Sequence, residues 1–468
     1  MDQEQKESIK NFVCQHVFNW SQQEGVVNYV LNQIDAVLVE LILKEWPQEW
    51  PSIVNDLISS ATTEPRTCQN NLKVIAMLSH QVVDFGSQEM TSTRILQVSA
   101  ALNGIAPDVF QLVEQVLSGT NDSQVIISSL EAFRYIVKWL DSHFIFETEL
   151  LGALCNSFLI NPQYQSYVLS IIGEIASKPN IPDRYTQIFP GIFDLIVTAL
   201  RQTISDSNIV DLAFESPETI KSLTFTLSSI LSAYGSVIEQ SKQFESLGTA
   251  LNWIIEIMNI TDFDNFKTCC ELWKTLIRRY YLEKNVVAFD FYNPFFPVIR
   301  RIMIKRMERP VEILIVEQDD GTIEKEVTKN SSQVDHYNTM RECLVFLSNI
   351  DGKDMVAAIS ERIEQLHQQY SIATLNSICW SAGAISGTLS YPDEKKFVIM
   401  VIKELLQLNS NENATKEDKA TIASGIMFVC SSYPRFLTDN WSFLKEIEKN
   451  LFHIIIIKNI CIRNFLLK

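Results

Sequence analysis

The stretch SSLEAFRYIVKWLDSHF, residues 128–144, decides the fold class of this chain. Its apolar side chains recur at steps of three and four residues, which gathers them on one face of an α-helix. These positions are Leu130, Phe133, Ile136, Val137 and Leu140. The same pattern returns in FESLGTALNWIIEIMNI (244–260), EKKFVIMVIKELLQL (394–408) and WSFLKEIEKNLF (441–452). The chain is therefore predicted to consist of amphipathic helices.

Short polar segments separate the predicted helices at regular distances. They read NGIAPDV (103–109), SGTNDSQ (118–124), SKPNIPDRY (177–185), DFDNF (262–266), SYPDEKK (390–396) and NSNENATKED (409–418). Helix pairs recur about every 40 to 50 residues, the period typical of HEAT and armadillo arrays. One pair cannot bury its own apolar face, whereas stacked pairs bury a continuous core. We predict an all-α HEAT-repeat superhelix (solenoid); a helical protein of two domains remains the alternative.

One segment has the alternation of β-strands instead. In EILIVEQDDGTIEKEV (312–327), Asp320-Gly321 is a strong hairpin turn signal. The predicted hairpin is acidic, and Lys325 is its one basic residue. Five of its carboxylates cluster near the turn and on the second strand: Glu317, Asp319, Asp320, Glu324 and Glu326. Such a hairpin could cross a solenoid groove and contact a basic partner, or it could be a solvated surface loop.

A basic stretch, VIRRIMIKRMERP (298–310), comes directly before this hairpin. Its cations are Arg300, Arg301, Lys305, Arg306 and Arg309. Helical spacing places Arg301 and Lys305 on one face, with Ile302, Met303 and Ile304 directed inward. The cations could pair with the acidic hairpin or with a partner, but a solvated helix face is the favoured interpretation.

The composition favours an ordered helical protein with protein partners. Hydrophobic residues make up 46%, charged residues 20%, and Gly and Pro number only 14 each. The net charge of −17 would repel a phosphate backbone, so no direct nucleic-acid binding is expected. The nine scattered cysteines contain no C-x-x-C pair and are typical of buried, reduced thiols. The polar N-terminus lacks a signal peptide, and we expect no membrane insertion.

Signatures of enzymes and metal sites are lacking in the sequence. No phosphate-binding glycine loop occurs, and GAISG (383–387) has its serine one place too late for a nucleophile elbow. Its small residues are predicted to permit close helix packing instead. The six histidines lie far apart, at His16, His80, His143, His336, His367 and His453. We therefore predict no enzyme, no catalytic, cofactor-binding or metal-ligating residues, and no cofactor.

Several of these segments resemble the exportin-1 family of nuclear export receptors, within the importin-beta/karyopherin class. The resemblance lies in LVELILKEWPQEWPSIVNDLI (38–58), CQNNLKVIAMLSHQVVDF (68–85), SLEAFRYIVKWLDSHFIFETELL (129–151), RMERPVEILIVEQDDGTIEKEV (306–327), LNSICWSAGAISGTLSYPDEKKFVIMVIKELL (375–406) and DKATIASGIMFVCSSYPRFLTDNWSFLKEIEKNLF (418–452). It extends from near Glu7 to near Phe452 and is similar to the N-terminal half of the family.

The resemblance implies a ring-like HEAT solenoid that binds Ran in its GTP form together with export-signal cargo. It also implies nucleoporin contacts and a location in the nucleus, the cytoplasm and the nuclear pore. In the family an acidic loop shifts with Ran binding. That role is carried over to Glu317, Asp319, Asp320, Glu324 and Glu326. The alternative is a decayed helical-repeat interaction scaffold without transport activity, which would have no need of an acidic hairpin.

The chain also departs from the family pattern. It is under half the usual length, so it is expected to be truncated, to lack the first Ran-contacting repeats, and to bind leucine-rich export-signal cargo only with missing C-terminal repeats. The tail HIIIIKNICIRNFLLK does not match. The expected regions are 1–34, a remnant of the N-terminal importin-beta-like repeats; 35–185, exportin-1-like HEAT repeats; 186–310, further HEAT repeats; 311–335, the acidic hairpin; 336–452, HEAT repeats; and 453–468, the non-matching tail.

Overall fold

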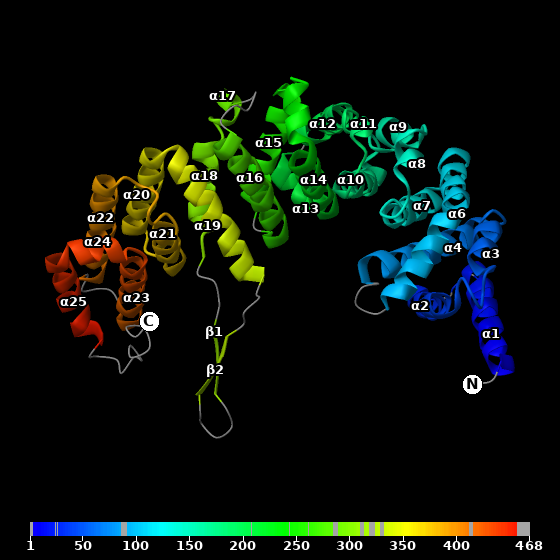
Figure 1. Cartoon of the computed structure of the whole chain (residues 1–468), viewed down its shortest axis with the longest axis horizontal. Helices are drawn as coiled ribbons and strands as arrows, with labels where there is room; N and C mark the ends of the chain where they lie inside the picture. Colours follow the sequence, from blue (N-terminus) through cyan, green and yellow to red (C-terminus); the bar gives the residue numbers. More distant parts are fainter. Residues whose placement is uncertain are drawn as a thin grey trace. The chain divides into compact units, whose positions relative to one another are not determined.

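A computed structural model describes residues 3–455, except 24, 26, 86–90, 207, 243, 261, 284–288, 309–312, 318–322, 328–331 and 411–414. The chain divides into two compact units, Met1–Trp253 and Ile254–Lys468. In both units almost all described residues outside the turns are helical, and the helices pack side by side (Figure 1).

The first unit contains α-helices joined by short turns. They are α1 (Gln3–Gln22), α2 (Asn28–Glu45), α3 (Ile53–Ala61), α4 (Pro65–His80), α6 (Ser92–Gly119), α7 (Ser123–Ile136), α8 (Ser142–Phe146), α9 (Leu150–Ala153), α10 (Pro162–Ser177), α11 (Asp183–Thr186), α12 (Phe189–Asp206), α13 (Ile209–Glu215) and α14 (Pro217–Gln240). Two π-helical turns, η1 (Gln81–Phe85) and η2 (Leu154–Phe158), interrupt the series, and α15 (Phe244–Met258) crosses the boundary between the units.

The second unit continues with helices and two strands. Its elements are α16 (Phe263–Glu283), α17 (Phe289–Tyr292), α18 (Phe296–Arg306), β1 (Ile313–Glu317), β2 (Ile323–Val327), α19 (Ser332–Ile350), α20 (Gly352–Gln368), α21 (Ile372–Ala384), α22 (Tyr391–Asn409), α23 (Lys416–Ser432), α24 (Pro434–Asp439) and α25 (Trp441–Ile455). The strands pair antiparallel, with Glu317 opposite Ile323, Val316 opposite Glu324 and Leu314 opposite Glu326.

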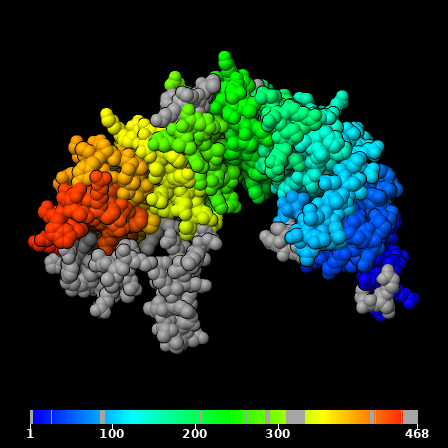
Figure 2. All heavy atoms as spheres, viewed as in Figure 1, coloured from blue at the N-terminus to red at the C-terminus, as the bar shows by residue number. Residues whose placement is uncertain are grey.

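Helices pack on the helices that follow one repeat later. In the first unit α4 packs on α7, α7 on α10 and α10 on α14. In the second unit α16 packs on α19, α19 on α21 and α21 on α23, while α18, α20 and α22 form a neighbouring row. With all heavy atoms drawn as spheres, neighbouring helices within each unit lie in contact at the surface (Figure 2). This is the all-helical repeat fold, with stacked helices as in a HEAT solenoid.

The predicted apolar face of residues 128–144 is part of the core of the first unit. Leu130, Phe133, Ile136, Val137 and Leu140 are each at most 1% exposed. The prediction that all five lie on one helix was wrong for Val137 and Leu140, because α7 ends at Ile136. The carbonyl oxygens of Val137, Lys138 and Leu140 accept hydrogen bonds from the Nζ atom of Lys178 at 2.8–3.0 Å. An ammonium group from the next repeat thus takes the place of further helical amides.

Most predicted breaks coincide with helix ends, because polar side chains cap the following helices. Asp122 caps α7 and Ser390 caps α22, while Thr415 and Asp418 form a capping box at α23.

The predicted break at 103–109 was wrong, since α6 runs through it with Pro107 inside the helix. Ala106 and Val109 on either side are buried, and their packing outweighs the backbone hydrogen bond that proline cannot donate.

Candidate interaction surfaces

The predicted acidic residues fall partly on the two strands. Glu317 ends β1, and Glu324 and Glu326 lie on β2. Asp319 and Asp320, with the Asp-Gly turn, lie outside the described residues. The backbone register therefore brings Glu317, Glu324 and Glu326 into one antiparallel pair of strands (Figure 1).

The basic stretch is built into the repeat stack. Arg300 is only 1% exposed; its Nη1 pairs with the Asp354 carboxylate of α20, and its Nη2 donates to the Leu347 carbonyl at 3.1 Å. Arg301 is bonded to both Asp354, at 3.1 Å, and Glu361, at 2.6 Å. Burial lowers the pKa of Arg300, whereas the hydrogen bond to Glu361 raises the pKa of Arg301. Both residues thus join α18 to α20.

Arg306 contacts neighbouring helices as well. Its Nη1 donates to the carbonyl oxygens of Met258 and Ile260 at 2.9 and 2.6 Å, at the end of α15. The favoured interpretation of a solvated helix face was therefore wrong for Arg300 and Arg306, because unpaired carbonyls and a carboxylate of adjacent helices provide partners that water would otherwise supply. It holds for Lys305, which is exposed; Arg309 lies outside the described residues. The inward direction of Ile302, Met303 and Ile304 is confirmed.

Sequence reasoning missed a recurring contact between cations and helix ends. Arg94 donates to the Leu43 and Trp46 carbonyls at the end of α2, at 2.7 and 2.6 Å. Lys178 occupies the same position at the end of α7, and Arg306 at the end of α15. Each cation lies roughly one repeat after the helix that it caps, so only an alignment of the repeats could have revealed the pattern.

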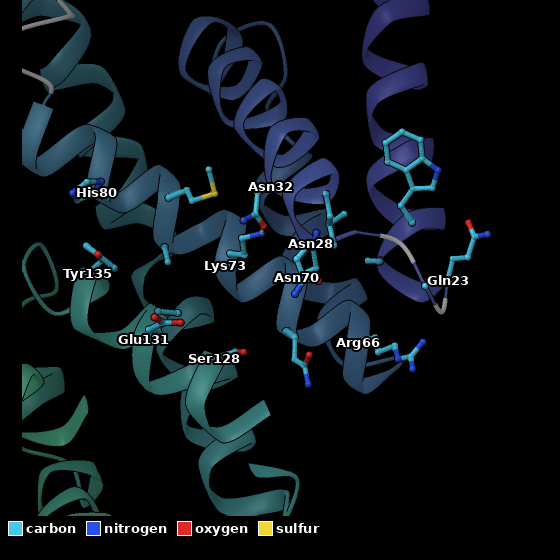
Figure 3. Close-up of a pocket in the computed structure, with 18 residues that line it drawn as sticks. Gln23, Asn28, Asn32, Arg66, Asn70, Lys73, His80, Ser128, Glu131 and Tyr135 are labelled. Atoms are coloured by element: carbon cyan, nitrogen blue, oxygen red, sulfur yellow. Dashed lines mark hydrogen bonds between the residues drawn. The ribbon is translucent and has the colours of Figure 1, made fainter. Parts of the chain in front are cut away.

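Four helices of the first unit enclose a polar groove of about 710 Å³. Amide side chains from α2 and α4 line it with the cationic Arg66 and Lys73 (Figure 3). Glu131, on α7, is the one carboxylate among its described lining residues. Because these residues lie about a hundred positions apart, no local pattern in the sequence predicted the groove. Its donors, acceptors and cations are suited to the backbone and acidic side chains of a protein partner.

A buried carboxylate holds the central cation of this groove. The Oδ2 of Asp35, which is 0% exposed, accepts from Lys73 Nζ at 2.8 Å, and its Oδ1 accepts from Asn70 at 3.0 Å. Burial raises the pKa of Asp35, while Lys73 and Asn70 oppose that shift. Lys73 also donates to the Asn32 side chain. The groove is therefore a fixed arrangement of side chains rather than a set of independent surface groups.

The second unit has a groove of about 740 Å³ between the first turns of α20 and α22. Val356, Phe397 and Met400 contribute to its apolar lining, and Lys353 and Lys396 also line it. Elsewhere in this unit the small residues pack as predicted. An added Cβ at Gly383 would lie 2.6 Å from the Phe428 ring, so close helix packing at GAISG is confirmed.

Reactive groups are not gathered into a site in the described part of the chain. There, no three His, Cys, Asp or Glu side chains come close enough to hold a metal ion. Cys68, Cys155, Cys269, Cys270, Cys343, Cys379 and Cys430 are buried free thiols, and Cys14 is half-buried. Burial raises the pKa of Cys155 to about 11 and that of Cys379 to about 12, so neither is a thiolate near neutral pH.

No helix among the described residues is long and apolar enough to cross a bilayer.

Comparison with known proteins places these helices in a family context. Residues 27–172 match the family described as Exportin 1-like protein. Residues 289–355 and 367–416 match CRM1 / Exportin repeats 2 and 3. The three matches follow one another along the chain.

Curated relatives align with nearly the whole chain. Exportin-1 of Schizosaccharomyces pombe is 28% identical over 492 aligned residues, covering 97% of this chain and 46% of the relative. Exportin-1 of Drosophila melanogaster is 30% identical, covering 96% and 44%. Protein EXPORTIN 1A of Arabidopsis thaliana is 29% identical, covering 96% and 45%. The chain thus spans about half the length of the curated relatives that it matches.

Proposed function

Because the chain belongs to the exportin-1 family, we propose that it is a nuclear export receptor, or a truncated form of one. The observation that carries the proposal is the ordered series of exportin matches between residues 27 and 416. The family consists of transport receptors rather than enzymes. The proposed partners are the small GTPase Ran in its GTP form, export-signal cargo and nucleoporins, with exchange between nucleus and cytoplasm through the pore.

The proposed mechanism is coupled binding. If Ran-GTP and cargo each favour the same conformation of the helix stack, each raises the affinity for the other by the same factor. Cargo with a leucine-rich export signal is proposed to bind only when the C-terminal repeats of the longer relatives are also present. Ran-GTP binding is the step proposed for this chain by itself.

Two surfaces support contact with a protein partner. The acidic hairpin residues Glu317, Asp319, Asp320, Glu324 and Glu326 are proposed as the Ran-coupled element, because clustered carboxylates attract a basic surface and speed its approach. The polar groove around Lys73 offers amides and cations, a chemistry that complements a backbone segment with acidic side chains.

The experiment replaces the five hairpin carboxylates by serine and follows association with Ran-GTP by stopped flow. The sequence predicts a solvated hairpin, whose charges would contribute little to stability, so thermal stability is expected to stay nearly unchanged. Direct contact predicts association slower by about tenfold at low salt, with a weaker salt dependence. A hairpin that masks the Ran site predicts faster association instead.

A matched control removes the same amount of charge elsewhere. Serine replaces five exposed carboxylates on helices of the stack, Asp108, Glu114, Glu215, Glu218 and Glu256. If the hairpin variant and the parent chain give overlapping traces at low and high salt, the hairpin has no part in Ran association. If the control slows association as much as the hairpin variant does, net charge alone accounts for the effect.

A further inference from the structure

The segments on both sides of the hairpin meet at one aromatic ring. Arg306 ends α18 before β1, and His336 lies in the first turns of α19 after β2. The guanidinium carbon of Arg306 lies 3.9 Å from the ring centroid of Phe266 on α16. The His336 ring meets the same Phe266 ring edge-on, with centroids 5.2 Å apart and an interplanar angle of 71°. Phe266 is only 1% exposed, so both contacts lie in the core.

Additional bonds hold each of these residues against α15 and α16. Arg306 donates to the carbonyl oxygens of Met258 and Ile260, as described above. The His336 ring also packs edge-on against Phe263, at 5.1 Å and 70°. Ser332, the first residue of α19, accepts a hydrogen bond from Lys267 Nζ at 3.0 Å. The end of α18 and the start of α19 are therefore both held against α16, one before the hairpin and one after it.

The chemistry of the contact is compatible with a stable arrangement at neutral pH. A guanidinium over an aromatic face is attracted by the ring quadrupole, and the attraction is larger where water is excluded. Burial lowers the pKa of His336 to about 4, so the imidazole is neutral and adds no like charge beside Arg306. Its Nδ1 has no hydrogen-bond partner among the described residues. The contacts of this imidazole with Phe263 and Phe266 are those of an aromatic edge.

We propose that Phe266, Arg306 and His336 form an anchor that ties the two ends of the hairpin segment to each other and to α16. Loosening either end then loosens the other, although the two are separated by the whole hairpin in sequence. A partner that displaces the hairpin acts on α16 and on the end of α15 through the same three residues. Only this last link rests on the proposed function; the anchor itself does not.

Hydrogen–deuterium exchange of the full chain tests the anchor through peptides covering 300–308 and 332–340. Arg306→Lys keeps the charge but loses the planar face over Phe266 and the Nη1 group that donates to two carbonyls. We expect about tenfold faster exchange in both peptides, the effect of losing a partly buried cation–π contact. His336→Ala should likewise accelerate exchange in 300–308. His336→Phe keeps the aromatic edge, so it should restore wild-type exchange.

The matched control is Arg301→Lys, the same change on the same helix at a residue that pairs with α20. It should leave exchange in 332–340 at the wild-type rate. If each substitution accelerated exchange only in the peptide that contains it and left exchange in the peptide on the other side of the hairpin unchanged, the anchor would be overturned. A second measurement, stopped-flow association with Ran-GTP, separates the two proposals. Faster exchange across the hairpin with unchanged association would support the anchor and remove the hairpin from the proposed function.

Discussion

Replacing Asp354 by alanine should destabilise the second unit far more than the position of this residue on the surface side of α20 suggests. Its carboxylate pairs with Arg300, which is 1% exposed, and bonds to Arg301 at 3.1 Å. Without Asp354 the buried guanidinium of Arg300 keeps only the Leu347 carbonyl, at 3.1 Å. A buried charge that loses its partner is strongly unfavourable because neither water nor a counter-ion compensates it.

The magnitude follows from the burial of each partner. Removing one member of a buried pair costs about 3–5 kcal/mol, and the 23% exposure of the Asp354 side chain points to about 3 kcal/mol. Arg300→Met should cost less, about 1 kcal/mol, because Met fills the space, no buried charge is left behind, and only the Leu347 carbonyl is left without its partner. Asp354 keeps Arg301 as its partner in that variant. Glu361→Ala should cost at most about 1 kcal/mol, because this carboxylate is 49% exposed.

Urea unfolding followed by far-ultraviolet circular dichroism measures these differences. The expected order of destabilisation is Asp354→Ala first, then Arg300→Met, then Glu361→Ala. The double variant Arg300→Met, Asp354→Ala should be less destabilised than the sum of its two single variants, because it leaves no buried charge behind. If Asp354→Ala were no more destabilising than Arg300→Met, the reasoning from the buried guanidinium would be refuted.

Three further predictions concern single side chains. The free energy of unfolding should fall by about 3 kcal/mol as the pH drops from 6.5 to about 4, because the unfolded chain binds a proton that folded His336 excludes; His336→Phe should flatten urea-measured stability across that window. Lys178→Met should cost about 2–4 kcal/mol in urea unfolding, since three carbonyls at the end of α7 lose their donor; an unchanged midpoint would show that water replaces it. Gly425→Ala should lower the thermal midpoint, costing about 1–3 kcal/mol, because the new Cβ would lie 2.7 Å from the Cys379 sulfur; a midpoint equal to wild type would mean that Cys379 moves aside freely.

The helical faces could be predicted from the sequence because they depend on spacing along one helix. Leu130, Phe133 and Ile136 illustrate this, since the period that places them together also buries them. Helix ends were predictable where a polar cap follows a turn, as at Asp122. They were not predictable where the tertiary fold decides. Pro107 remains inside α6, and the carbonyl directly after α7 accepts a hydrogen bond from Lys178 of the next repeat.

The candidate surfaces were harder to predict for the same physical reason. The partners of Arg300 and Arg306 lie on α20 and α15, about 50 residues away, so the basic stretch looked like a solvated face. The polar groove around Lys73 combines side chains from helices that share no motif. The pairing of β1 with β2 was predictable because the alternation that indicates it is a local feature of one short segment.

Nucleotide-dependent binding of Ran tests the central claim most directly. The chain is immobilised and exposed by biolayer interferometry to Ran loaded with a non-hydrolysable GTP analogue, and separately to Ran loaded with GDP. An export receptor of this family is predicted to bind the GTP form and to leave the GDP form unbound, because only one nucleotide state favours the receptor's binding conformation. Equal binding of the two forms, or no binding of the GTP form, would contradict the proposed function.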